Sequence, residues 1–163
     1  MTMSDKPSSQ LTKLDFVAPI SGEALPLTEH YEPVISHGLQ GQGIMLKPLG
    51  SRLVAPCDGV VTEVAATSHQ IKLQASHGVI VELTCGSSAI TTHGVGFTRK
   101  INLGQRVKQG DPLIELDLIN IRKQLPHLDI ALLISHGVLT TKPHYGSVRV
   151  AEETVLTGII KQK

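Results

Sequence analysis

Histidine and cysteine are the residues of this 163-residue sequence that could carry a reacting group or a metal near neutral pH. Its two cysteines lack CxxC spacing, which favours reduced thiols, and Cys85 has no basic neighbour to lower its pKa, so we interpret it as a small buried apolar residue. His77 and His93 are interpreted as exposed turn residues, because nothing adjacent would orient a ring nitrogen. The eight histidines are His30, His37, His69, His77, His93, His127, His136 and His144.

Two familiar site types are missing from the sequence. A zinc peptidase of β architecture needs a His-x-His pair, and a biotinyl or lipoyl carrier needs an exposed lysine at a hairpin tip, usually as Met-Lys-Met. Neither pattern occurs. We therefore expect no cofactor and no resident metal.

One pair of side chains is predicted to meet across a hairpin. A two-residue loop at 76–77 is expected to join the apolar segments 69–75 and 79–84, and this register places His69 directly opposite Thr84. Directly opposed residues have Cβ atoms ~5 Å apart, within reach of an imidazole for a hydroxyl. His69 and Thr84 are therefore the first candidate site.

The elements that would position this pair are mostly strands. From residue 16 onward, short apolar segments alternate with Gly, Pro, Asp and Asn clusters, which is typical of an all-β, antiparallel sandwich or barrel. One short helix is predicted at 118–125 and ends before Pro126. Residues 1–15 are polar without an apolar stripe, so we predict a flexible and dispensable arm before a single domain at 16–163.

Two turn-rich pieces resemble each other. LVAPCDGVVTEV at 53–64 and GQRVKQGDPLIELD at 104–117 each combine a glycine turn with a following strand. We interpret them as two halves of one pseudo-repeated β unit. The alternative is two unrelated turns with similar chemistry.

Composition excludes several functions. The formal net charge is +1 and only four residues are Phe or Tyr, so the chain offers neither the basic excess nor the stacking rings that nucleic-acid binding uses. No apolar run approaches the ~20 residues of a membrane span, and the N-terminus lacks a signal-peptide pattern. We expect a cytoplasmic monomer without stable membrane insertion.

A series of motifs resembles the glucose-family enzyme IIA domain of the bacterial sugar phosphotransferase system. They run in order along almost the whole chain after the predicted arm: VAPISGEALPL, GQGIMLKP, LVAPCDGVV, GFTRKINLGQRVKQGDPLIELDL, LLIS and GSVRV. The resemblance implies an antiparallel β sandwich of a duplicated hybrid motif. In that family a histidine takes a phosphoryl group from the histidine-containing phosphocarrier protein and passes it to a cysteine of a membrane sugar permease.

The resemblance also assigns roles to positions of this sequence. The supporting histidine and its threonine fall on His69 and Thr67, whereas the phosphoacceptor position falls on Thr84. Threonine is a weak nucleophile without a base, although His69 could in principle be that base. The apolar docking positions fall on Ile35, Ala65 and Glu82, and these site residues include a carboxylate where the family has a large ring. The set of protein partners is therefore expected to differ.

Two functions remain from the sequence. The first is a non-phosphorylatable regulatory or protein-binding homologue of enzyme IIA, acting on proteins of the phosphotransferase system or on regulated enzymes and transporters. The second is an active phosphocarrier that uses His69 or another histidine. Zinc held between His69 and a partner's carboxylate is also left open.

Overall fold

The protein is described here by a computed structural model covering residues 11–138 and 140–161. Within that part of the chain, every pair of neighbouring strands is antiparallel. The strands form three sheets. The predicted all-β antiparallel fold is confirmed.

The largest sheet has eight strands in the order β13-β2-β3-β11-β7-β6-β5-β9. Their bounds are β2 (Gly22–Pro26), β3 (Gln42–Pro48), β5 (Gly59–Val64), β6 (Gln70–Gln74), β7 (Ile80–Thr84), β9 (Arg106–Val107), β11 (Ile130–His136) and β13 (Gly146–Val148). The second sheet has the order β4-β10-β8, with β4 (Arg52–Val54), β8 (Phe97–Arg99) and β10 (Pro112–Leu116). The third has the order β1-β14-β12, with β1 (Leu11–Val17), β12 (Thr140–Pro143) and β14 (Thr154–Lys161).

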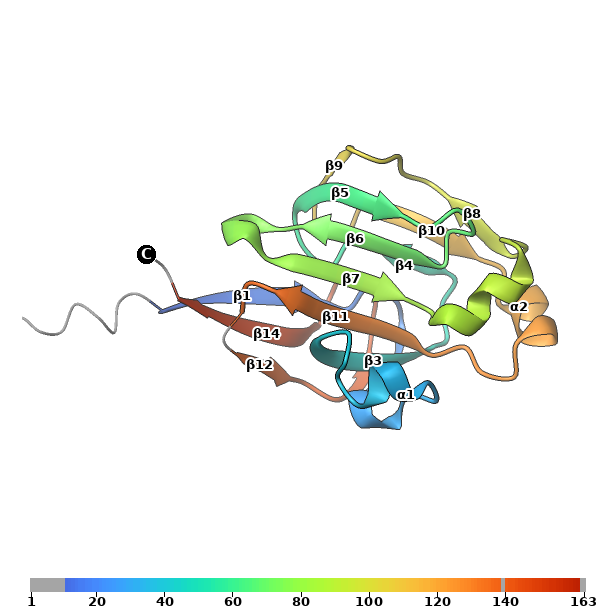
Figure 1. Cartoon of the computed structure of the whole chain (residues 1–163), viewed down its shortest axis with the longest axis horizontal. Coiled ribbons are helices and arrows are strands. Elements are labelled where there is room, and N and C mark those ends of the chain that lie inside the picture. The colour runs from blue at the N-terminus through green and yellow to red at the C-terminus, as the bar shows by residue number, and fades with distance from the viewer. Residues whose placement is uncertain (1–10, 139, 162–163) are drawn as a thin grey trace, which may run out of the picture.

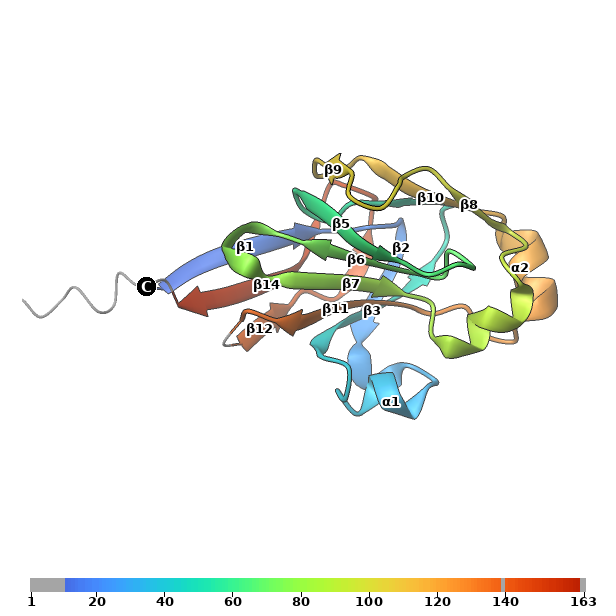
Figure 2. The ribbon, with the colours of Figure 1, turned by 45° about the horizontal axis from the view of Figure 1, so that its top comes forward.

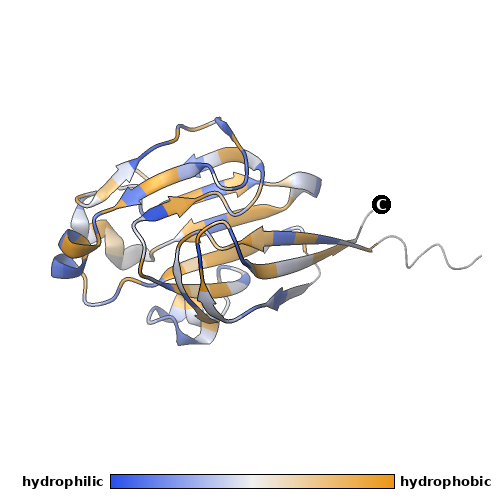
Figure 3. Cartoon of the chain, turned by 180° about the vertical axis from the view of Figure 1, so that it is seen from behind, coloured by the Kyte–Doolittle hydropathy of each residue, from blue (hydrophilic) through white to orange (hydrophobic). Residues whose placement is uncertain are grey.

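The large sheet and the β4-β10-β8 sheet form two layers with the core between them (Figures 1 and 2). Alternation along β7 directs Val81 and Leu83 into this core, where they join Leu53 and Ile114 of the second layer. The intervening Glu82 and Thr84 face the other side of the sheet. Apolar and polar residues alternate along many of the strands when the molecule is coloured by hydropathy (Figure 3).

The two turn-rich pieces predicted as halves of one unit lie against each other. Their strands pair crosswise, β4 with β10 and β5 with β9. At their turns, the Ala55 amide donates to the Asp111 carbonyl over 2.9 Å, and the Gly110 amide donates to the Ala55 carbonyl over 2.9 Å. The Gln109 amide also donates to the Asp58 carboxylate over 2.7 Å. The two turns therefore fix each other's position.

Helices are few and short. The predicted helix is α2 (Leu118–Gln124), and the Asp117 carboxylate caps it by accepting from the Asn120 amide over 3.2 Å. A single turn, α1 (Pro33–Ser36), precedes β3 and was not predicted. The described residues also contain three 3₁₀ turns, η2 (Leu27–Glu29), η3 (Ser76–Gly78) and η4 (Ser87–Thr92). No helix in residues 11–138 and 140–161 is long and apolar enough to cross a membrane.

The predicted boundary of the N-terminal arm is wrong. Residues 11–15 belong to β1, which pairs with β14 from Leu11 opposite Lys161 onward. The Asp15 carboxylate also accepts a hydrogen bond from the Thr157 hydroxyl over 2.8 Å. A polar, half-exposed edge strand carries little apolar signal, which is why its sequence resembles an arm. The rest of the predicted arm lies outside the described residues.

Removing β1 should destabilise the domain. A chain that begins at Phe16 loses most of the ladder with β14 and the Asp15–Thr157 hydrogen bond. We expect its melting temperature to fall by roughly 4–8 °C, the shift that about 2 kcal/mol gives a domain of this size. A chain that begins at Leu11 is the control, because it retains β1, and equal melting of the two chains would contradict a stabilising role for the strand.

Candidate functional site

The hairpin between β6 and β7 has a register different from the one predicted. Its loop has three residues, η3, with His77 at φ 59° and Gly78 at φ 73°, and the Ala75 amide donates to the Val79 carbonyl over 2.8 Å. Thr84 consequently lies opposite Gln70, one residue from the predicted partner. Because side chains alternate between faces, the prediction that His69 and Thr84 oppose each other directly is wrong.

His69 is nevertheless a close neighbour of the end of β7. It lies just before β6, and its carbonyl accepts from the Cys85 amide over 3.0 Å. His69 and Thr84 border the same small internal gap beneath the sheet. The two candidate residues therefore lie near each other without facing each other in the ladder.

The hydroxyl of Thr84 is held by its own backbone. Thr84 is 4% exposed, and its Oγ1 accepts a hydrogen bond from the Gly86 amide over 2.9 Å. Bonds of this kind, from a backbone amide to a hydroxyl two residues earlier, are common where a strand turns away from its sheet. The Thr84 side chain thus fixes the turn into η4.

The imidazole of His69 is hydrogen-bonded to the side chain of Thr67. The hydrogen bond joins Thr67 Oγ1 and His69 Nδ1. The His69 side chain is buried, with the residue 8% exposed. Burial lowers the pKa of His69, and the nearby Glu32 carboxylate only partly offsets this effect. His69 is therefore neutral at pH 7, and the structure brings Thr67 and His69 together as the resemblance implied.

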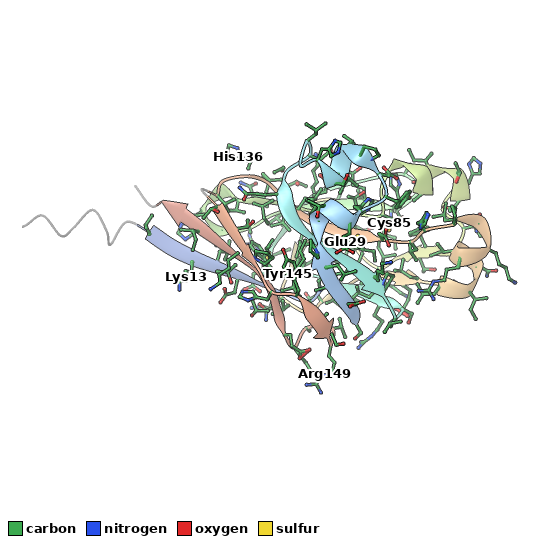
Figure 4. The ribbon with its side chains drawn as sticks, turned by 90° about the horizontal axis from the view of Figure 1, so that it is seen from below. Lys13, Glu29, Cys85, His136, Tyr145 and Arg149 are labelled. Carbon is green, nitrogen blue, oxygen red and sulfur yellow. The ribbon has the colours of Figure 1, made fainter. Side chains whose placement is uncertain are left out.

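Glu32 and His30 belong to this site and were missed in the sequence. Glu32 lies immediately before α1, and its carboxylate is so close to Gly86 that a Cβ there would lie 2.3 Å from Glu32 Oε2. The Glu32 amide donates to His30 Nδ1 over 3.1 Å. A His-x-Glu pattern before a proline was the available signal, but only the tertiary structure carries this segment to the end of β7 (Figure 4, in which Cys85 is labelled).

The three predicted docking residues are linked through shared neighbours, Leu133 and Gln70, but two of the three are buried. Ile35 of α1 is 1% exposed and packs on Leu133 of β11. Glu82 is 4% exposed and lies directly opposite Leu133, and its carboxylate accepts from Gln70 Nε2 over 2.5 Å. The half-buried Ala65 lies in the turn before β6, with its amide bonded to the Gln70 carbonyl.

Other side chains of α1, of η4 and of the turn after η4 are exposed. Val34 of α1, Ile90 of η4 and Val95 after it are 38%, 49% and 55% exposed. Lys72 lies opposite Glu82 and forms an ion pair of 3.4 Å with Glu63.

The remaining candidate residues are two exposed histidines and the buried Cys85. His77 and His93 are exposed, with φ values of 59° and 52°, in the turn positions predicted for them. Cys85 is buried as predicted, and burial raises the pKa of its thiol to about 12. No group of three or more His, Cys, Asp or Glu side chains in the described part of the chain could hold a metal ion.

The fold and the site together define a class: an antiparallel β sandwich with a buried imidazole at the end of its central strands, beneath a short capping segment. The chain belongs to the family described as "phosphoenolpyruvate-dependent sugar phosphotransferase system, EIIA 1", whose match covers residues 14–137. This confirms the enzyme IIA resemblance of the sequence motifs.

Individual relatives agree with this assignment. The chain is 29% identical over 158 residues to the glucose-specific EIIA component of Borreliella burgdorferi, covering 92% of this chain and 84% of that one. It is 32% identical over 124 residues to that of Haemophilus influenzae, covering 76% and 75%. It is 35% identical over 136 residues to the mannose-specific EIIBCA component of Corynebacterium glutamicum, covering 83% of this chain but only 19% of that longer protein.

A solved structure has the same fold. The glucose permease IIA from Mycoplasma capricolum superposes with a TM-score of 0.85 at 25% sequence identity, covering 90% of this chain and 96% of that one. The predicted β sandwich is thus confirmed by comparison with a known structure. The chain is an EIIA domain of the sugar phosphotransferase system.

The buried carboxyl of Glu82 yields a pH-dependent prediction. Burial raises its pKa above the usual value, although Lys72 and Gln70 favour the charged form. The folded state therefore favours the neutral acid, and stability is lost as pH rises from about 4.5 through the raised pKa. Glu82→Gln stays neutral and keeps an oxygen for Gln70, so it should melt about 2–4 °C higher than the wild type at pH 7.5 and equally at pH 4.

The matched control is Glu63→Gln. It removes an exposed carboxylate on β5, opposite Lys72, which in turn lies opposite Glu82. It loses the ion pair with Lys72 and a small repulsion of the Glu82 carboxylate, so it should gain less stability at pH 7.5 than Glu82→Gln does. The measurement is the melting temperature of the wild type and both variants between pH 4 and pH 7.5. A lower melting temperature for Glu82→Gln at pH 7.5 would mean that attraction to Lys72 outweighs burial.

Proposed function

We propose that this EIIA domain does not carry a phosphoryl group and instead acts by binding protein partners. The observation that supports this most directly is Thr84, which stands where the sequence motifs place the family's acceptor histidine. Its hydroxyl is buried and accepts a hydrogen bond from the Gly86 amide. The scaffold of the family is retained while the atom that would react is absent.

Chemistry makes Thr84 a poor replacement for histidine. An imidazole nitrogen is nucleophilic near neutral pH, and its phosphoramidate transfers readily to another acceptor. A threonine hydroxyl needs a base to remove its proton, and its phosphate ester transfers poorly to a thiol. His69 is a candidate base, but it does not lie opposite Thr84 in the ladder.

A phosphocarrier that uses His69 is the second candidate function. The observation that favours it is the lowered pKa of His69, which keeps the ring neutral and nucleophilic at pH 7. Its burial, at 8% exposure, opposes it, because a partner's phosphoryl group must approach a ring nitrogen in line. Labelling the purified chain with phosphate from phosphoenolpyruvate, and mapping the labelled residue, separates the two functions.

The partners proposed are proteins of the phosphotransferase system, or enzymes and transporters that it regulates, in the cytoplasm. Glu82 stands where the resemblance places a large ring, and the partly exposed Lys72 opposite it carries a charge, which should disfavour partners that present a purely apolar patch. Val34, Ile90 and Val95 would supply the apolar contacts. The domain therefore keeps a docking face with altered specificity.

The first prediction for this function is the absence of transfer. With phosphoenolpyruvate, enzyme I and the histidine-containing phosphocarrier protein, the purified chain should acquire no acid-labile phosphate above background. Radiolabelling followed by acid treatment and peptide mapping measures this. Acid-labile label on His69 or His93 would overturn the proposal and establish the phosphocarrier.

The second prediction is a gain of function. Thr84→His restores an imidazole where β7 ends, and Thr67, His69 and Gly86 remain around it. We expect acid-labile labelling of this variant at position 84 under the same conditions. The double variant Thr84→His, His69→Ala is the matched control and should label at least tenfold less, since a supporting general acid or base typically contributes 10²–10⁴ in rate.

A further inference from the structure

His30 is a buried histidine that the proposed function does not use. It is 4% exposed, and both ring nitrogens have hydrogen-bond partners in the main chain. Nδ1 accepts from the Glu32 amide over 3.1 Å, so the ring proton resides on Nε2, which donates to the Asp129 carbonyl over 3.3 Å. The ring is therefore neutral and held in a single tautomer.

Glu32, whose amide is hydrogen-bonded to His30, links several parts of the site. The Glu32 carbonyl accepts from the Ile35 and Ser36 amides and thereby begins α1. Ile35 packs on Ala131 and Leu133 of β11. The Glu32 carboxylate lies against Gly86, at the end of β7. One imidazole thus fixes the backbone of a residue that joins α1 to the end of the central strand.

Other groups around the ring are few. Two carboxylates face it, Glu32 from the same segment and Asp129 from the segment before β11, and both favour its protonation. Tyr31 stacks on it with centroids 5.0 Å apart, and the exposed His127 stacks on Tyr31 at 4.9 Å. Burial outweighs the two carboxylates and lowers the pKa of His30 below its usual value.

Protonation would reverse the role of Nδ1. A protonated imidazole has two N–H donors and no acceptor, so Nδ1–H would face the N–H of Glu32. The Glu32 amide would then lose its acceptor inside the protein, which is unfavourable for a buried donor. The backbone at Glu32 must move to relieve this, and it takes the start of α1 with it.

We propose that His30 is an acid-sensitive latch, whose neutral ring holds Glu32 and α1 against the end of β7 and whose protonation releases them. The sign follows from linkage: the unfolded state binds the proton more tightly, so the latched state loses stability as pH falls from about 6.5 toward the lowered pKa. The helix α1, which carries the exposed Val34, is then held in place at neutral pH and loosened in acid. This device is independent of whether the domain carries phosphate.

The test is a pH titration of the full chain by NMR between pH 8 and pH 4.5. The amide resonances of Glu32, Ile35 and Gly86 should move together, with the midpoint of the His30 ring. The protection of the Glu32 amide against hydrogen exchange should fall about fivefold or more across this midpoint, as expected for the loss of one net hydrogen bond. Amides that do not respond while the His30 ring titrates would overturn the proposal.

Variants assign the transition to its group. In His30→Asn, the side-chain oxygen can still accept from the Glu32 amide but does not titrate, so the neutral-pH amide positions should be kept and the transition lost. Persistence of the transition in His30→Asn would overturn the proposal and assign it to His69, Glu32 or Asp129. Glu32→Gln and the exposed control His127→Ala should both retain it, and loss in Glu32→Gln would also contradict the latch. If His30→Asn shifts the neutral-pH spectrum, the exchange measurement on the wild type still decides.

Discussion

The pairing of β7 between β6 and β11 is the constraint on which the rest of the site depends. Thr84 is fixed opposite Gln70 on one side and Ala131 on the other. This register directs Val81 and Leu83 to the core and Glu82 and Thr84 to the opposite face. Because side chains alternate with period two, a shift of one residue would exchange a buried leucine with a carboxylate, at a cost that the fold could not sustain.

Polar groups accumulate where this strand ends, and each is satisfied locally. Thr84 is bonded to Gly86, His69 to Thr67, Glu82 to Gln70 and His30 to the Glu32 amide. No buried polar side-chain atom in the described part of the chain lacks a partner. Such a network confers a defined geometry on the site, because removing any one member would leave another group buried without a partner.

The fold of this EIIA domain is that of its family, whatever the chemistry of its site. The sandwich superposes on a glucose permease IIA with a TM-score of 0.85, although only 25% of residues are identical. That scaffold is held by the hydrogen-bonded turns at Asp58 and Gly110 and by the apolar core, none of which requires a particular residue at the site. In the function that we propose, a few substitutions near the end of β7 alter reactivity and docking, since function is determined by the site and not by the fold.

The sequence by itself determined the fold class, α2, the turn positions of His77 and His93, the burial of Cys85 and the membership of the EIIA family. These features depend on local signals, namely strand cadence, a proline that ends the helix, glycine turns and ordered motifs. Only the tertiary structure decided the register of the β6–β7 hairpin, because one residue in a loop shifts the whole ladder and sequence does not fix loop length. It alone placed Leu11 opposite Lys161 and brought Glu32 and His30 to Gly86, since contacts between distant segments depend on packing that no local pattern records.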